Sequence, residues 1–179
     1  MATEILRPNA TGDENTIPYD DPAIDNDDHW QHVDEAIADD DDTFIQTYYQ
    51  TWYRDLYNIP NSSVGAGTIS HITVYARCLP RTIPDQTSVK IAIKSTNVHE
   101  SAEKQLAEYK VWEDFSNQWA TNPDTDNPWT WGEINSLQIG IAMRSSTSTN
   151  GYTRFTQVYV IVDYTEAIAV GRSFGFIMG

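Results

Sequence analysis

Apolar and polar residues alternate with a period of two over much of this chain, a pattern typical of strands with one buried and one solvated face. The alternation is most regular in TISHITVYARCL, at residues 68–79. The residues predicted to face inward there are Ile72, Val74, Ala76 and Cys78. Those predicted to face outward are His71, Thr73, Tyr75 and Arg77.

Four further segments alternate in the same way and are predicted to be strands. They are TFIQTYYQTWY at 43–53, SVKIAIKS at 88–95, LQIGIAMR at 137–144 and RFTQVYVIVDY at 154–164. The first of them fits either one long strand or two strands joined by a bend. In the last, one face carries Thr156, Val158, Val160, Val162 and Tyr164, and the other carries Phe155, Gln157, Tyr159 and Ile161. Segments rich in Pro, Gly, Asn and Ser separate the strands, as turns do.

Helix is predicted at one short place only. In TWGE, at residues 130–133, the Thr130 side chain can accept from the Glu133 amide and Glu133 can reach back, which is the pattern of a capping box. The segment EKQLAEYKVWEDF, at 103–115, fits either a helix or a strand.

Short strands with turns between them and almost no helix predict an all-β fold: an antiparallel two-sheet β-sandwich, jelly-roll-like. Residues 1–28 are rich in Pro, Asp and Asn and are predicted to be an extended acidic N-terminal arm. Residues 29–165 are predicted to form the sandwich, and residues 166–179 an apolar C-terminal tail.

The net charge of −15 is concentrated at the start of the chain. Residues 1–42 hold 14 acidic residues and one basic residue, whereas residues 43–179 hold 12 acidic and 10 basic residues. This distribution argues against a nucleic acid as partner, since phosphate contacts need clustered Lys and Arg. It argues equally against an anionic membrane surface. The acidic leader is expected to meet a basic neighbour, bind cations or keep the chain in solution.

The single cysteine, Cys78, excludes an intrachain disulfide. The first residues lack the basic and apolar regions of a signal peptide, and no apolar run reaches the length of a membrane span. We therefore expect synthesis in a cytoplasm.

The stretch HWQHVDEAIADDDD, at residues 29–42, combines two histidines with many carboxylates. Zinc is disfavoured because His29 and His32 come without a Cys pair or an HExxH helix. Calcium suits flexible oxygen ligands better, so Asp39 and Asp41 are weak calcium candidates, although the EF-hand spacing is absent. The alternative, which we favour, is that consecutive aspartates repel one another and lie in water.

A second candidate stretch is NPDTDNPWTW, at residues 122–131. Asp124 and Asp126 are further weak calcium candidates. Trp129 and Trp131 are candidates for stacking on a sugar ring. The alternative, favoured here, is that the prolines stiffen a loop while the two indoles cover an edge of the sandwich.

Catalysis is not indicated by the sequence. It contains no G-x-S-x-G elbow, no P-loop and no G-x-G-x-x-G. A glycosidase needs two carboxylates across a cleft, and acids are too common in this chain for their presence to indicate such a pair. The chain is therefore predicted to be non-enzymatic, with no cofactor apart from the weak calcium candidates.

Several stretches, in order, resemble a recurrent β-sandwich domain of virion-type proteins from tailed phages and prophages. They are HWQHVDE followed by DDDDTFI, then ISHITVYARC, TNPDTDNPWTWGEINSLQIGI and TQVYVIVDY, and they cover most of residues 29–164. The resemblance implies that Trp30 and Val33 anchor their loop onto the sandwich, while Asp34 and Glu35 bond to backbone amides or an arginine. It supplies no catalytic residues.

That resemblance implies a structural role in a virus particle, as a capsid decoration, head-fibre or tail component made in the host cytoplasm. The partners would be other virion subunits, in a homo-oligomer or on a capsid or tail lattice. The apolar tail is expected to supply an interface, through Phe174, Phe176, Ile177 and Met178. The alternative is a carbohydrate-binding β-sandwich module that uses exposed aromatic side chains.

Overall fold

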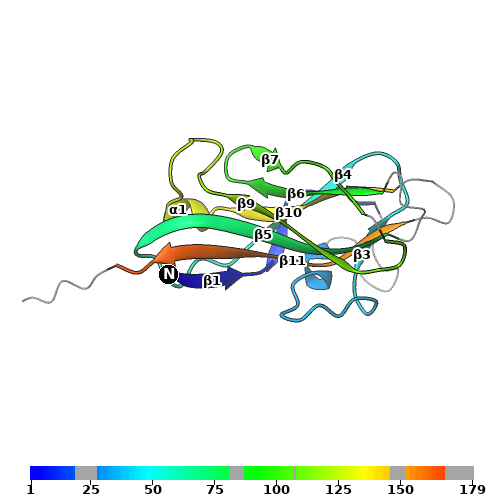
Figure 1. Cartoon of the computed structure of the whole chain (residues 1–179), viewed down its shortest axis with the longest axis horizontal. Coiled ribbons are helices and arrows are strands. Elements are labelled where there is room, and N and C mark those ends of the chain that lie inside the picture. The colour runs from blue at the N-terminus through cyan, green and yellow to red at the C-terminus, as the bar shows by residue number, and fades with distance from the viewer. Residues whose placement is uncertain (19–27, 81–86, 107, 146–151, 168–179) are drawn as a thin grey trace, which may run out of the picture.

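The computed structural model describes residues 1–18, 28–80, 87–106, 108–145 and 152–167. Its strands form two antiparallel sheets, which we name A and B (Figure 1). Sheet A has the order β1 (Ala2–Leu6), β11 (Thr153–Thr165), β5 (Thr68–Pro80) and β9 (Glu113–Trp119), with β3 (Ile45–Thr47) also on β11. Sheet B has the order β2 (Ala10–Asn15), β4 (Tyr53–Asn58), β10 (Gln138–Arg144), β6 (Ser88–Lys94) and β7 (Val98–Glu100), with β8 (Lys104–Gln105) also on β6.

The predicted all-β sandwich is confirmed, and the alternation of residue types sets its buried faces. On β5 the four residues predicted to face inward are at most 2% exposed, and the outward ones are half-buried. On β11 the side chains of Val158, Val160 and Val162 are fully buried, whereas Tyr159 and Ile161 lie on the outer face. Apolar side chains from both sheets form one core, because each sheet has one apolar face to remove from water.

The N-terminal segment, predicted to be an extended arm, pairs with both sheets. It is extended, but β1 pairs with β11 in sheet A and β2 pairs with β4 in sheet B. Leu6 and Ile17 belong to the core. Backbone pairing, which leaves little trace in composition, holds β1 and β2 in place.

Two segments that the sequence left open are now settled. Residues 43–53 form β3 and the start of β4, in different sheets, with a break at residues 48–52. Residues 103–115 contain β8 and part of β9 and no helix among the described positions. The capping box is confirmed: Thr130 accepts from the Glu133 amide, Glu133 accepts from the Thr130 amide, and the helix α1 (Trp131–Ile134) follows.

A buried carboxylate ties the N-terminal segment to sheet B. Asp55 on β4 is fully buried, and its Oδ1 accepts from the amides of Thr16 and Ile17 at 2.8 and 3.0 Å. Its Oδ2 lies 2.7 Å from Nδ1 of His29 and accepts from the Tyr57 hydroxyl at 3.2 Å. His29 begins the short 3-10 helix η1 (His29–His32), so this network fixes where the following loop leaves the core.

No helix in the described part of the chain is long and apolar enough to cross a membrane.

Candidate functional site

The loop at residues 33–44, between η1 and β3, runs beside β11 along the edge of sheet A; we name it the 33–44 loop (Figure 1). Its first residue, Val33, is fully buried, and its carbonyl accepts from the Val158 amide at 3.0 Å. The carbonyl of Glu35 accepts from Nε2 of Gln157 at 2.6 Å and from Nε of Arg7 at 3.1 Å. Backbone groups of the loop therefore attach directly to β11 and to the end of β1.

Three of the four consecutive aspartates bond to sheet A at the other end of the loop, which corrects in part the prediction that the run lies in water; Asp41 and Asp42 are exposed. Asp40 accepts from Nε and Nη2 of Arg77 at 2.6 and 3.1 Å, and Asp41 accepts from Nη1 of Arg154 at 2.9 Å. Asp39 accepts from the hydroxyl of Thr156 at 2.9 Å. Because these partners lie on β5 and β11, the acidic run is the means by which the loop is clamped to sheet A.

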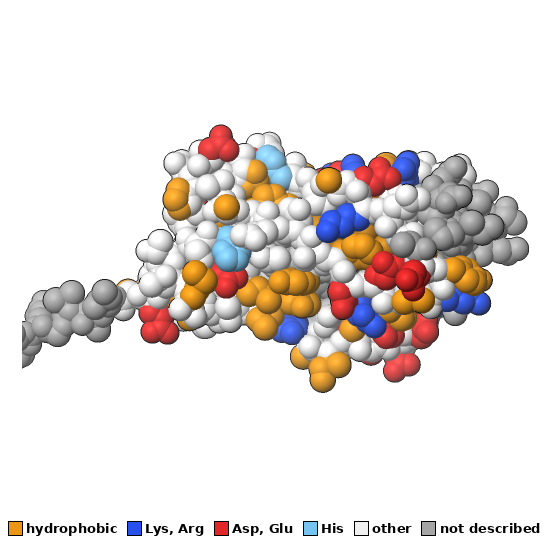
Figure 2. Space-filling view, viewed as in Figure 1, with side chains coloured by type: hydrophobic (Ala, Val, Ile, Leu, Met, Phe, Trp, Pro, Cys, Tyr) orange, Lys and Arg blue, Asp and Glu red, His pale blue; other side chains and the backbone are white. Residues whose placement is uncertain are grey.

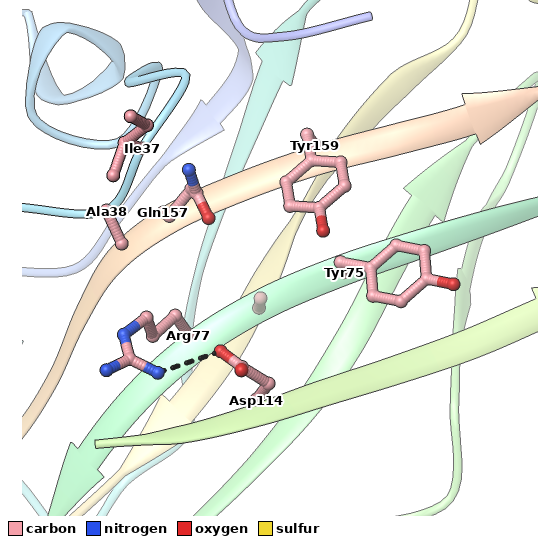
Figure 3. A pocket seen from close by; sticks show the side chains of 8 residues that line it. Ile37, Ala38, Tyr75, Arg77, Asp114, Gln157 and Tyr159 are labelled. Atoms are coloured by element: carbon pink, nitrogen blue, oxygen red, sulfur yellow. Dashed lines mark hydrogen bonds and ion pairs between the residues drawn. The ribbon is translucent and has the colours of Figure 1, made fainter. Parts of the chain in front are cut away.

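An open pocket of about 440 Å³ lies between the clamped loop and sheet A (Figure 3). Ile37 and Ala38 form its loop side, and Ile37 is 85% exposed. Its floor comes from the outer faces of β5 and β11, and one end reaches Asp114 on β9. An apolar hollow with a few polar groups is the usual form of a small-ligand site.

Two tyrosines form the floor. Tyr75 and Tyr159 are direct cross-strand partners, and their rings are nearly parallel, with centroids 5.1 Å apart and planes 10° apart. Figure 3 shows both rings broadside, one beside the other on neighbouring strands. Hydrophobic side chains also gather over β11 on this face of the molecule (Figure 2). Arg7 lies with its Cζ 5.5 Å from the Tyr159 centroid, within cation–π range.

The polar end of the pocket is an arginine between two aspartates. Besides its bidentate pair with Asp40, Arg77 donates through Nη1 to Oδ1 of Asp114 at 3.1 Å. These hydrogen bonds, above all the one with Asp40, raise the pKa of Arg77 further above its ordinary value. The Asp114 side chain stays 72% exposed. The guanidinium is therefore held rigidly, and Asp114 presents a carboxylate to solvent.

Glu35 is the most perturbed carboxyl group of the 33–44 loop. Burial raises its pKa from 4.5 to about 7, and the nearby charges of Asp39 and Asp34 act in the same direction. Thr43 Oγ1 lies 2.9 Å from Oε1 of Glu35 and 2.8 Å from Oδ2 of Asp39, while Oε2 of Glu35 is buried with no hydrogen-bond partner among the described residues. A carboxyl in such a position favours its protonated form.

The two tryptophans predicted to stack on sugar do not form a platform. Trp129 is 4% exposed and donates to the Trp119 carbonyl at 3.1 Å, so that candidate is corrected: its ring belongs to the core. Trp131 packs against the core, makes a T-shaped contact with the Tyr164 ring, and donates to the Gly67 carbonyl at 3.2 Å. Both indoles cover an end of the sandwich, as the alternative had it.

The four calcium candidates are not brought together. Asp39 accepts a hydrogen bond from Thr156, and Asp41 accepts one from Arg154. Asp124 accepts from the Thr96 amide at 2.7 Å and lies 2.9 Å from Nε2 of His99; these bonds, first of all that with His99, lower its pKa well below the ordinary value. Within the ranges that the structure describes, no three His, Cys, Asp or Glu residues converge on a point that could hold a metal ion.

The interface candidates Phe174, Phe176, Ile177 and Met178 lie outside the described residues. The predicted anchoring role of Val33 and Trp30 is confirmed, since Val33 is fully buried and Trp30 packs against the core. The sequence pattern places Tyr75 on an outward face and Tyr159 opposite the valines of its own segment, and it gives no reason to pair the two rings. Their meeting depends on β5 and β11 being neighbours, which alternation alone does not reveal.

Neither a family model nor a curated protein matches the sequence. Similar solved structures include TmCBM61 in complex with β-1,4-galactotriose, with a TM-score of 0.40 and 6% identity over 67% of this chain and 70% of that chain. A carbohydrate-binding module named CBM4 has a TM-score of 0.40 and 10% identity over 72% and 90% of the two chains. The sugar-binding C-terminal domain of EclA has a TM-score of 0.37 and 14% identity over 71% and 83%. At these scores no functional argument rests on the similarities.

Proposed function

We propose that this chain is a carbohydrate-binding β-sandwich module whose ligand lies on Tyr75 and Tyr159 beneath the 33–44 loop. The observation that carries the proposal is the pair of nearly parallel tyrosine rings on the floor of an open pocket. The C–H face of a sugar ring is apolar and flat, so it can pack on an aromatic face while its hydroxyls remain free for hydrogen bonds.

The polar groups around the rings suit such hydroxyls. Asp114 and the amide oxygen of Gln157 can accept hydrogen bonds, and the tyrosine hydroxyls can donate or accept. Asp114 is the one carboxylate among the described residues that line the pocket. Glycoside hydrolysis ordinarily needs two carboxylates across the sugar, so we propose binding without cleavage.

The test is affinity electrophoresis of the whole chain through gels that contain single polysaccharides, followed by calorimetry on those that retard it. We expect Tyr75→Ala and Tyr159→Ala each to weaken binding by about tenfold or more, since each removes one ring of the platform. Tyr49→Ala is the matched control, because Tyr49 is 49% exposed and does not line the pocket. Binding that survives both pocket substitutions would place the site elsewhere.

The role as a structural subunit of a virus particle stays a prediction, as do its partners, its localisation and the absence of catalysis. Native mass spectrometry of the full chain tests it, because a subunit of a closed assembly forms a defined oligomer. A glycan-binding module and a virion subunit do not exclude one another. The pocket on sheet A favours the carbohydrate proposal as the one to test first.

A further inference from the structure

The ligand class follows from the charges around the pocket, if the proposed carbohydrate function holds. Arg77 is the one cation among the described residues that line it, and alone it would favour an anionic ligand. However, Asp40 occupies Nε and Nη2 at 2.6 and 3.1 Å, and Asp114 occupies Nη1 at 3.1 Å. Two carboxylates therefore surround one guanidinium, and the polar end of the pocket carries a net negative charge.

The other end does not reverse this balance. Arg7 lies above Tyr159, and its charge acts on Asp34, whose pKa it lowers against the larger effect of burial. The donors of Arg7 are directed to the carbonyls of Glu35 and Ala36. With the two arginines set against Asp34, Asp40 and Asp114, the surroundings stay negative in a chain whose net charge is −15. Such a field repels carboxylates and sulfates on a ligand.

The hydrogen-bonding groups left for a ligand are mostly acceptors. Nε2 of Gln157 is engaged by the Glu35 carbonyl, and in Figure 3 the amide oxygen of Gln157 points away from that loop. The carboxylate of Asp114 is the most exposed polar group at the site, at 72% of its side chain. Acceptors need donors, which sugar hydroxyls supply and ionised carboxylates and sulfates do not.

We infer that the pocket takes neutral polysaccharides and rejects uronic-acid and sulfated ones, with Asp40 and Asp114 as the residues that set this specificity. The pair of aspartates does so by neutralising Arg77 and by presenting acceptors to hydroxyls. This inference rests on the proposed function, and it assigns to the acidic run of the 33–44 loop a role in ligand choice as well as in clamping.

The experiment compares retardation by neutral gels (galactan, xylan, mannan and β-glucan) and by anionic gels (polygalacturonate and heparin). The chain is tested with its natural sequence, as Asp114→Asn and as the double variant Asp40→Asn with Asp114→Asn. The matched control is Asp13→Asn with Glu103→Gln, which removes the same charge from pairs beside sheet B. Asp114→Asn leaves the Asp40 clamp in place, so the test does not depend on the double variant folding.

We expect the natural chain to bind at least one neutral polysaccharide about tenfold or more tightly than either anionic one. Asp114→Asn is expected to reduce this preference for the neutral polysaccharide. The double variant is expected to bind the anionic polysaccharides about tenfold more tightly than the natural chain does. The control variant should bind them no more tightly than the natural chain. Tyrosine-dependent binding of the natural chain to an anionic gel overturns the inference and leaves the proposed function standing. Continued rejection of anionic gels by a folded double variant also overturns it. Retardation by no gel overturns the proposed function and the inference together.

Discussion

Asp55 shows what a single charged residue does inside this sandwich. It is fully buried and joined to four groups from the N-terminal segment, from η1 and from its own strand. A buried carboxylate is stable only when its oxygens are saturated in this way, because the cost of removing it from water must be offset by hydrogen bonds. It thus links the position of the first strands to the origin of the 33–44 loop.

Asp55→Ala is therefore expected to lower the free energy of unfolding by about 3 kcal/mol, because it leaves two backbone amides, His29 and Tyr57 without their acceptor. Urea unfolding measures the change. Asp41→Asn is the control: its side chain is 61% exposed, so breaking its pair with Arg154 should cost less than about 1 kcal/mol. Equal losses in the two variants would contradict the role given to the buried network.

Glu35 makes stability depend on pH near neutrality. Its pKa is about 7 when folded and 4.5 ordinarily, so between these values the folded chain holds a proton that the unfolded chain has released. Raising the pH through this window therefore lowers stability. We expect Glu35→Gln to raise the urea midpoint relative to the natural chain at pH 8 and to leave it nearly unchanged at pH 4. A difference between the two proteins that is constant across this range would refute the assignment.

At the scale of elements, β1 protects a strand edge, a role that its residue pattern does not indicate. It covers the edge of β11 over residues 160–164, with Leu6 buried below it. An uncovered strand edge offers unpaired amides and carbonyls to other chains. The short strand thus protects the central part of β11 from self-association.

Deleting residues 2–6 is expected to increase exchange at those amides among residues 160–164 that donate to β1 rather than to β5, and to promote association of the chain. Residues 153–155 of the same strand pair with β3, so their amides should stay protected and serve as an internal control. Hydrogen exchange read residue by residue, with light scattering on the same samples, measures both effects. Uniform loss of protection along β11 would mean instead that the deletion unfolds the whole sheet.

The elements also show where sequence reasoning succeeds and where it stops. In β5, β6, β10 and β11 large apolar side chains alternate with small or polar ones, so a period of two reveals them. β2 reads ATGDEN and buries little; its Gly12 lies where an added Cβ would collide with the carbonyl of Leu56. Close backbone approach of this kind gives no hydrophobic pattern. The aromatic floor was missed for a different reason, since it depends on the order of strands rather than on any one strand.

On the scale of the whole molecule, acidic residues concentrated at the start of the sequence form ion pairs with basic residues later in the chain. The first 42 residues carry 14 of the 26 acidic residues. In the structure, carboxylates of this leader pair with basic residues of the body: Asp13 with Lys94, Glu14 with Arg54, Asp40 with Arg77 and Asp41 with Arg154. The negative charge of the leader is thus paired with positive charge on strands of both sheets.

The sheet order has a further consequence for how the chain is made. β1 and β3 pair only with β11 among the described strands, and β11 is the last of these strands to leave a ribosome. A nascent chain that stops before residue 153 therefore has no central strand for sheet A, and three partner edges stay uncovered. Domains rich in such distant pairings fold slowly. This chain is therefore expected to bind chaperones through most of its synthesis. Sheet A is expected to assemble late, in one step, once β11 is available.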